Sequence, residues 1–242
     1  MLTKPIYIIS DLHLGDGHPE LLEAFERFID IKARNAHALY ILGDLFEAWV
    51  GDDDESLTAK RVCERLKSLA ELGVPVFYMH GNRDFLVGKS YIKQACMHSL
   101  PDPSVVTFDG HDILMSHGDL LCTHDIPYQR YRWLVHRSWL QALFLALPRS
   151  FRDKLGNKIR MKSQEQGSKK TMNLMDVDEE TVTKWLKQYQ VYTIVHGHTH
   201  KPFKHFYPMS HPPFTRFVLG AWENGQARIL CYQRGELAFV DL

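Results

Sequence analysis

The chain has 242 residues, of which 45% are hydrophobic and 24% are charged, and its 29 basic residues balance 29 acidic ones. This composition is typical of a globular protein with a sizeable core, and the balanced charge does not indicate a polyanionic partner. The four cysteines are widely spaced, which predicts neither a disulfide framework nor a zinc ribbon. With no signal-peptide pattern and no apolar run near the about 20 residues of a membrane span, a cytoplasmic location is expected.

Short β-rich runs alternate with helical patterns in the first hundred residues. Strands are predicted at 6–9, 38–42 and 74–80, and each leads into a motif that contains Asp or Asn. Between them, one run of apolar residues at helical spacing follows Pro19, and a second helix ends before Gly73. This alternation predicts right-handed crossovers and a largely parallel sheet with helices outside.

After about residue 104 the pattern becomes that of hairpins. Val105 to Phe108 and Asp112 to Ser116 flank Asp109-Gly110, which is a strong hairpin signal. Further strands, separated by turns at Asn224-Gly225 and Arg234-Gly235, are predicted at 191–195, 214–219, 227–232 and 237–240. These strands predict a second, more antiparallel sheet packed on the first. The expected fold class is therefore α/β, a two-sheet sandwich flanked by helices.

Residues 125–175 show no strand pattern, and their aromatic and leucine residues predict helices interrupted at Pro148. The expected organisation is a core of residues 1–124 and 176–242 with a helical insertion, or lid, at 125–175. Between residues 125 and 170, eleven basic residues stand against three acidic ones, a surplus of about eight positive charges. Interleaved with aromatic residues, this charge favours contact with anionic lipid or acyl chains. Single-stranded nucleic acid and a plain solvated helical face are the alternatives.

Five short motifs fall at or just after the carboxyl ends of predicted strands. They are Asp11-Leu12-His13, Gly43-Asp44, Gly81-Asn82-Arg83-Asp84, His117-Gly118-Asp119 and Gly197-His198-Thr199-His200. Each motif alone is explained by turn or helix-cap chemistry. All five in order predict an active site, because the loops at these strand ends meet in open α/β sheets.

The residue types in these motifs favour a site for divalent ions such as Mn, Fe or Zn, because they offer carboxylate, imidazole and amide ligands but no thiolate. Glycines keep the loops tight enough for short side chains to reach a common centre. The candidate ligands are too many for one ion and suit two ions that share a carboxylate. They are Asp11, His13, Asp44, Asn82, His117, His198 and His200.

The ordered set of motifs resembles the calcineurin-like metallophosphoesterase superfamily, in a two-sheet sandwich. The stretches 10–15, 45–49 and 81–86 resemble one family in particular, the bacterial UDP-2,3-diacylglucosamine hydrolases of lipid A biosynthesis, and the similarity extends over nearly the whole chain. The resemblance implies two metal ions per chain, with Mn²⁺ expected. It assigns Asp11, His13 and His200 to one ion, Asn82, His117 and His198 to the other, and Asp44 to both.

The same resemblance implies hydrolysis of the pyrophosphate bond of UDP-2,3-diacylglucosamine. Water activated by the metals is expected to attack the uridine-side phosphorus, giving UMP and 2,3-diacylglucosamine 1-phosphate. A monomer associated peripherally with the cytoplasmic face of the inner membrane is expected, without nucleic acid. The implied catalytic residues are Asp44, Asn82, Arg83 and His117. The implied substrate contacts are Asn82, Arg83, Asp125, Ser163, Lys170 and His198, and the match is weakest around 164–168.

Arg83 indicates which kind of phosphoester bond the protein cleaves. Many members of the superfamily have a histidine after Gly-Asn, where it can protonate an alkoxide leaving group. Arginine is a poor general acid but can bind a phosphate bidentately. A phosphate leaving group has a second pKa of about 6 and needs no proton, so Arg83 favours pyrophosphate cleavage. The alternatives are another phosphodiesterase, acting on nucleotides or nucleic acid, and a non-enzymatic scaffold, although none of the seven ligands is missing.

Overall fold

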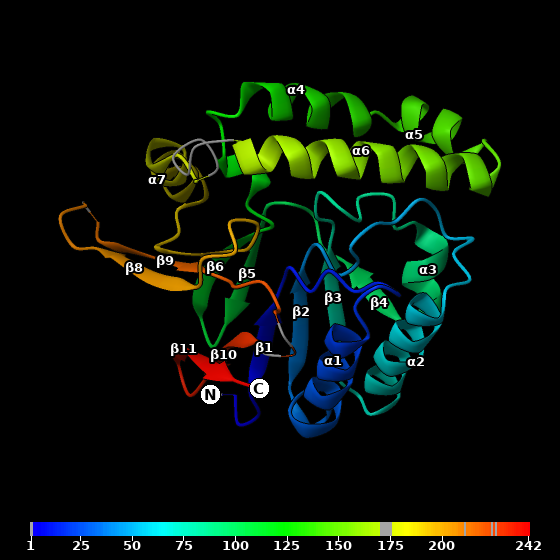
Figure 1. The fold of residues 1–242 in the computed structure, drawn as a ribbon. Helices are drawn as coiled ribbons and strands as arrows, with labels where there is room; N and C mark the ends of the chain where they lie inside the picture. Colours follow the sequence, from blue (N-terminus) through cyan, green and yellow to red (C-terminus); the bar gives the residue numbers. More distant parts are fainter. Residues whose placement is uncertain (1, 170–175, 211, 224, 226) are drawn as a thin grey trace.

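Two β-sheets lie face to face with helices on their outer sides (Figure 1). The computed structural model describes residues 2–169, 176–210, 212–223, 225 and 227–242, and the side chains at 160 and 162–169 are not described. In this part of the chain, none of the helices has the length and apolar character needed to cross a membrane. The expected α/β sandwich of two sheets is confirmed.

The first sheet has six strands in the order β11-β10-β1-β2-β3-β4. In chain order they are β1 (Ile6–Ile9), β2 (Ala38–Leu42), β3 (Val76–Met79), β4 (Met97–Ser99), β10 (Arg228–Gln233) and β11 (Glu236–Asp241). Strands β1 to β4 pair in parallel, as expected from the alternation of strands and helices. Strand β10 pairs antiparallel with β1, and β11 pairs antiparallel with β10.

The second sheet has five strands in the order β5-β6-β7-β9-β8. They are β5 (Ser104–Phe108), β6 (His111–Ser116), β7 (Thr193–His196), β8 (Phe203–Tyr207) and β9 (Phe214–Val218). The predicted hairpin at Asp109-Gly110 is confirmed, and β6, β7 and β9 pair in parallel.

The sequence interpretation was wrong to place 227–232 and 237–240 in the second sheet. The middle four residues of β10 are all buried, so this strand suits the centre of either sheet. Its sequence therefore does not indicate which strand it pairs with. Strand β8 was not predicted, because its exposed edge position carries aromatic residues on both faces.

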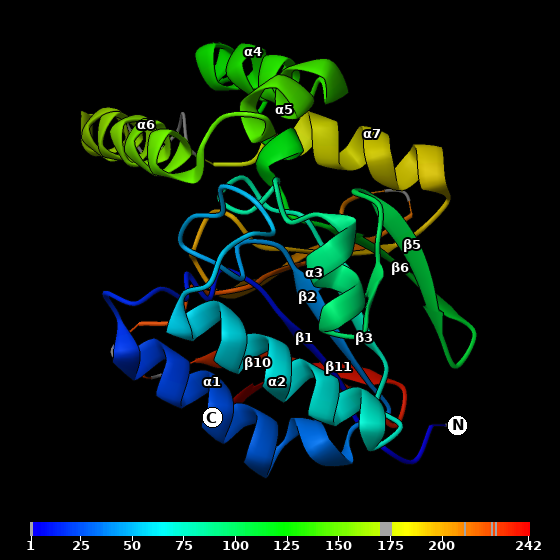
Figure 2. The same cartoon turned by 90° about the vertical axis from the view of Figure 1, so that its right-hand side faces the viewer.

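Helices cover both outer faces. Helices α1 (Pro19–Ile31), α2 (Leu57–Glu71) and α3 (Lys89–Gln94) pack against the first sheet in one hydrophobic core (Figure 2). A second core fills the space between the sheets, with residues such as Ile8, Tyr40 and Phe217. Helix α7 (Glu179–Tyr189), which was not predicted, packs Val182 and Leu186 onto the outer face of the second sheet. The result is a four-layer α/β/β/α sandwich.

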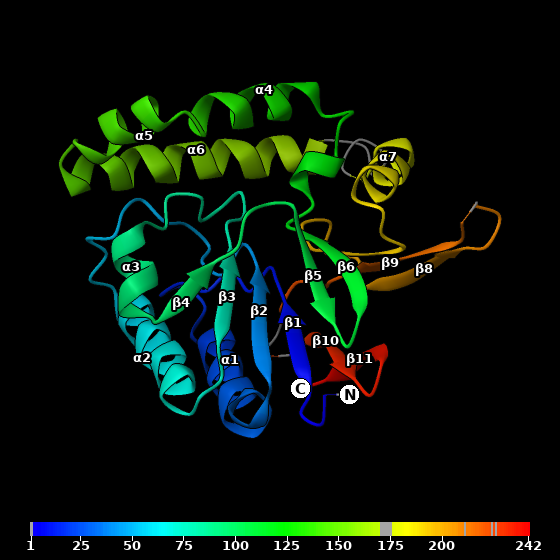
Figure 3. The ribbon, with the colours of Figure 1, turned by 180° about the vertical axis from the view of Figure 1, so that it is seen from behind.

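Three further helices lie across the carboxyl ends of the parallel strands (Figures 1 and 3). They are α4 (Ile126–Val135), α5 (Ser138–Leu145) and α6 (Arg149–Lys169), and Pro148 separates the last two as predicted. We refer to α4–α6 as the lid helices; the boundaries of the insertion at 125 and 175 stay a prediction.

Two arginines at the start of α6 join the lid helices to the core loop that precedes α2. The Arg149 Nη2 lies 2.6 Å from Asp54 Oδ1, and Arg152 Nη1 lies 3.0 Å from Asp53 Oδ1. Part of the basic charge that the sequence places in the insertion is therefore neutralised by core carboxylates.

Candidate metal centre

The five predicted motifs follow β1, β2, β3, β6 and β7, and all of them lie at the same ends of these strands. Their backbone is unusual: Asp11, His13, Asp44, His198 and His200 all have positive φ angles, between 51° and 69°. Such left-handed conformations cost free energy for residues other than glycine and are concentrated at functional sites. Five of the seven predicted ligands adopt one.

One group of predicted ligands contains Asp11, His13 and His200. His200 Nε2 lies 3.3 Å from Asp11 Oδ1 and also 3.3 Å from His13 Nε2. Two atoms that bind one ion at about 2.1 Å in tetrahedral geometry lie roughly 3.4 Å apart. The spacing of these three side chains therefore fits a divalent ion.

A second group contains Asn82, His117 and His198. The Asn82 Oδ1 lies 2.9 Å from His117 Nε2 and 2.8 Å from His198 Nδ1. Asp44 stands between the two groups, because its Oδ2 lies 4.0 Å from His13 Nε2 and 3.8 Å from His117 Nε2. This donor set of carboxylate, imidazole and amide atoms suits two divalent ions with Asp44 in common.

Hydrogen bonds from the backbone orient these ligands. His117 Nδ1 lies 2.9 Å from the Leu42 carbonyl oxygen and donates to it, so Nε2 is the nitrogen that would bind a metal once it has lost its proton. The Asp11 carboxylate accepts from the His198 N–H at 3.0 Å and from the Ser10 hydroxyl. The backbone N–H of Arg83 donates to Asp44 Oδ1 at 2.8 Å.

Asp84 connects the loops after β2 and β3. It is fully buried, and its two carboxylate oxygens accept from four backbone N–H groups. The shorter bonds come from Gly81 at 2.8 Å and Leu45 at 2.7 Å, and Asp44 and Phe46 donate at 3.3 Å. Asp84 belongs to a predicted motif, but its role was missed because it supports ligands without being one.

Two glycines allow the loops to approach each other closely. A Cβ atom at Gly81 would lie 2.1 Å from Asp44 Oδ1, and one at Gly197 would lie 2.3 Å from Asp11 Oδ2. Any side chain at these positions would displace a predicted ligand. The expected role of glycine in keeping the loops tight is confirmed at these two positions.

The ligand pKa values are strongly perturbed in this arrangement. Burial raises the pKa of Asp44 to about 6, against the opposing charges of His117 and His13. Burial lowers the pKa of His117, but the charges of Asp44, Asp119 and Asp11 outweigh this and raise it to about 9. Burial, helped by the His117 charge, lowers the pKa of His198 to about 4. Divalent ions bind deprotonated ligands and would displace the protons that Asp44 and His117 hold.

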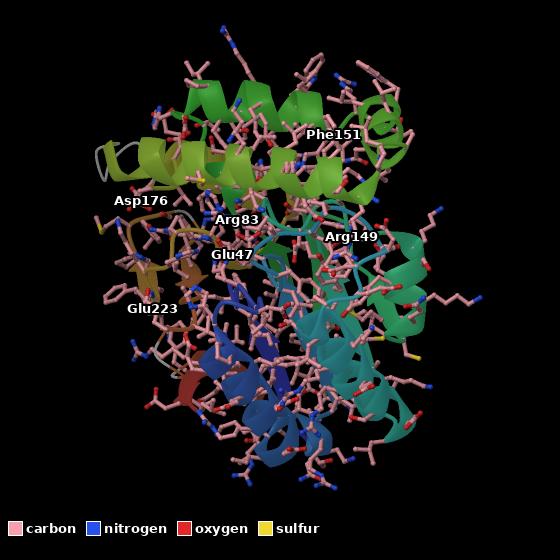
Figure 4. All side chains as sticks on the ribbon, turned by 45° about the vertical axis from the view of Figure 1, so that its right-hand side comes forward. Glu47, Arg83, Arg149, Phe151, Asp176 and Glu223 are labelled. Carbon is pink, nitrogen blue, oxygen red and sulfur yellow. The ribbon has the colours of Figure 1, made fainter. Side chains whose placement is uncertain are left out.

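Of the predicted substrate contacts, Asn82 and His198 belong to the second ligand group, and Arg83 and Asp125 are also among the described residues. The Arg83 side chain is partly buried, with Nη1 4.0 Å from Glu47 Oε1, and Figure 4 shows both residues below α6. Asp125 is buried at the start of α4, where it accepts from the Tyr128 N–H at 3.2 Å. The Ser163 side chain and Lys170 lie outside the described residues, so their predicted contacts stay predictions.

Known proteins match this chain over most of its length. The family model for calcineurin-like phosphoesterases matches residues 4–202. UDP-2,3-diacylglucosamine hydrolases of Salmonella paratyphi C (strain RKS4594) and Salmonella choleraesuis (strain SC-B67) are each 44% identical over 216 residues, which cover 89% of this chain and 90% of theirs. The chain belongs to the UDP-2,3-diacylglucosamine hydrolase family of calcineurin-like phosphoesterases. It is therefore a metal-dependent phosphoesterase, which confirms the family predicted from the sequence.

Proposed function

We propose that this phosphoesterase hydrolyses the pyrophosphate bond of UDP-2,3-diacylglucosamine, to UMP and 2,3-diacylglucosamine 1-phosphate, in lipid A biosynthesis. The name of its relatives supports this substrate. The observation that carries the proposal is the position of Arg83 beside Asp44, which stands 3.8–4.0 Å from a histidine of each ligand group.

The residues fit two divalent ions, and we propose Mn²⁺ for both sites. Asp11, His13 and His200 would hold one ion, Asn82, His117 and His198 the other, and Asp44 both. When bound, such ions polarise phosphoryl oxygens and lower the pKa of water toward 7.

Arg83 is proposed to bind the substrate phosphate. Its backbone N–H is already used by Asp44, while its guanidinium faces Glu47 at a distance too long for a strong ion pair. The guanidinium can therefore turn to a phosphate, where two parallel hydrogen bonds are possible. Since a phosphate leaving group needs no protonation, the site requires no histidine at this position.

A pocket supports an acylated substrate. It has a volume of about 530 Å³ and lies between α3 and α5, lined by Phe85, Leu86, Ile92 and Leu145 among others. The apolar part of its lining suits a hydrocarbon chain, and Lys89 and Lys93 also line it. Phe85 and Leu86 come two and three residues after Arg83, so an acyl chain in this pocket would lie close to a phosphate held at Arg83.

We also propose that the lid helices bring the protein to the cytoplasmic face of the inner membrane. Trp133, Trp139, Leu143 and Phe151 are each more than 60% exposed, although they are large and apolar. Exposed apolar side chains among basic ones favour reversible binding to anionic lipid. The exposed apolar side chains therefore favour lipid over nucleic acid as the partner of the insertion.

The test of the membrane proposal uses the double substitution of Trp139 and Leu143 to aspartate. Wild-type protein should co-sediment with vesicles of phosphatidylglycerol and dissociate as salt rises, because screening acts over about 8–10 Å at 0.1–0.15 M. The variant should lose this binding and gain a higher KM for the lipid, with unchanged turnover of bis-p-nitrophenyl phosphate. Equal loss on both substrates would mean that these residues only maintain the fold.

The test of the reaction is hydrolysis in heavy-oxygen water, with the purified chain and Mn²⁺. Attack at the uridine-side phosphorus should place the label in UMP. Label in the sugar phosphate would contradict the proposed geometry. Turnover of bis-p-nitrophenyl phosphate or cyclic AMP without turnover of the nucleotide-sugar lipid would instead support a different phosphodiesterase on this scaffold.

A further inference from the structure

Helix α4 is attached to the core mainly by polar contacts. None of its residues is fully buried. Three of its side chains converge on one core residue, Asp119: Tyr128 Oη and Arg132 Nε each lie 2.6 Å from Oδ2, and Gln129 Nε2 lies 2.7 Å from the carbonyl oxygen. The position of α4 therefore depends strongly on this single buried aspartate.

Asp119 also lies beside the metal centre. It follows the predicted ligand His117 by two residues, and its side chain is only 1% exposed. On the other side of His117, Asp102 accepts from the His117 N–H at 3.3 Å and lies 3.7 Å from Arg132 Nη2. The Arg132 guanidinium thus lies between the buried Asp119 carboxylate and the partly buried Asp102 carboxylate, which flank the segment carrying His117.

Two further contacts connect α4 to the site. The Tyr128 ring faces the His198 ring at an angle of 29° between the planes, with the centroids 6.1 Å apart. Asp125, a predicted substrate contact, is the N-cap of the helix, so any shift of α4 moves it. A rigid-body movement of α4 would therefore alter the surface above His117 and His198 without removing any predicted ligand.

We propose that Asp119 and Arg132 are a positioning pair that sets where the lid helix α4 lies over the metal centre. The pair determines selection of the large lipid substrate and leaves phosphoester hydrolysis itself intact. The identity of that substrate rests on the proposed function; the positioning of α4 does not. Asp119 lies in a predicted motif, but the motif assigned it no role.

The test compares Arg132→Met with Arg130→Met, a matched control on the exposed side of the same helix. Loss of the pair should raise KM for UDP-2,3-diacylglucosamine about tenfold, as expected for one charge-assisted hydrogen bond. Turnover of bis-p-nitrophenyl phosphate should change less than about twofold, because the ligands stay in place. Amides of 126–135 should exchange hydrogen faster in Arg132→Met, with the core sheets unchanged. Arg130→Met should match wild type in all three measurements.

Removing Arg132 leaves the buried Asp119 carboxylate without its charge partner, and this alone could unfold the protein. The double variant Asp119→Asn with Arg132→Met removes both charges and is the second arm. It should recover the stability that the unpaired Asp119 carboxylate costs, although Asp102 still loses its contact with Arg132, and it should keep the fast exchange in α4 and the raised KM.

Unchanged hydrogen exchange in α4 for both variants would overturn the proposal. An equal loss of activity toward the lipid and toward the soluble diester would also overturn it. If wild type fails to hydrolyse the lipid, the proposed function fails instead. The exchange rates then still decide whether Asp119 and Arg132 position α4.

Discussion

Replacing Asp84 with alanine is expected to destabilise the fold and to weaken metal binding together. The carboxylate is fully buried and accepts two short hydrogen bonds, from Gly81 N–H at 2.8 Å and Leu45 N–H at 2.7 Å, besides two longer ones at 3.3 Å. Each short bond to a charged acceptor contributes about 1.5–3 kcal/mol. Their loss predicts a fall of roughly 3–6 kcal/mol in the free energy of unfolding, since water does not reach the N–H groups left behind.

Urea unfolding of the metal-free protein measures the loss of stability, and titration with Mn²⁺ measures the affinity. The affinity should fall about 10–100-fold, as for other residues that orient metal ligands. Asp16→Ala is the matched control, because this exposed carboxylate also accepts two bonds, from Thr58 Oγ1 at 2.6 Å and Thr58 N–H at 3.2 Å, and is not a predicted ligand. It should cost about 1 kcal/mol and leave the affinity unchanged. Wild-type metal affinity in Asp84→Ala would refute the reasoning.

Two further outcomes are expected. The variant Asp44→Ala should lose both metal ions, whereas His117→Ala should lose mainly one, so Asp44→Ala should have the lower activity. Metal analysis that finds two ions per chain in Asp44→Ala would exclude a bridging role for Asp44. Burial, with the nearby charge of Arg132, lowers the pKa of His136 to about 4, so the unfolded chain takes up a proton there first as the pH falls. His136 should therefore destabilise the fold progressively from pH 6.5 down to about 4, by on the order of 2 kcal/mol. The variant His136→Phe, which keeps the ring packed on Phe85, should show a flatter dependence of urea midpoints over this range, and an unchanged slope would contradict the assignment.

Much of the metal centre follows from local sequence. A β-rich run that ends in Gly-Asp or Gly-Asn predicts both a buried strand and polar groups at its end. Because parallel strands end at the same edge of a sheet, the chain order alone predicts that Asp11, Asp44 and Asn82 meet. Their individual roles as ligands stay a prediction, although the distances between them suit shared ions.

Other features depend on residues that are far apart in the sequence. Asp84 supports Asp44 because backbone N–H groups from two loops donate to the Asp84 carboxylate, and no pattern of residue types predicts this arrangement. The same holds for Arg132: the sequence shows only that it belongs to a basic segment, and the structure places it against Asp119 and Asp102.

Residue types and strand periodicity are local properties, so they predicted the α/β class, the family and the kinds of ligand atom at the candidate site. The sheet that β10 and β11 join depends on contacts between distant segments, since a strand such as β10, buried on both faces, is compatible with either sheet. The packing of the lid helices on the core depends on such contacts as well. Some of their basic side chains pair with carboxylates nearly a hundred residues away in the sequence, as Arg149 pairs with Asp54. Such pairs form only when the chain has folded.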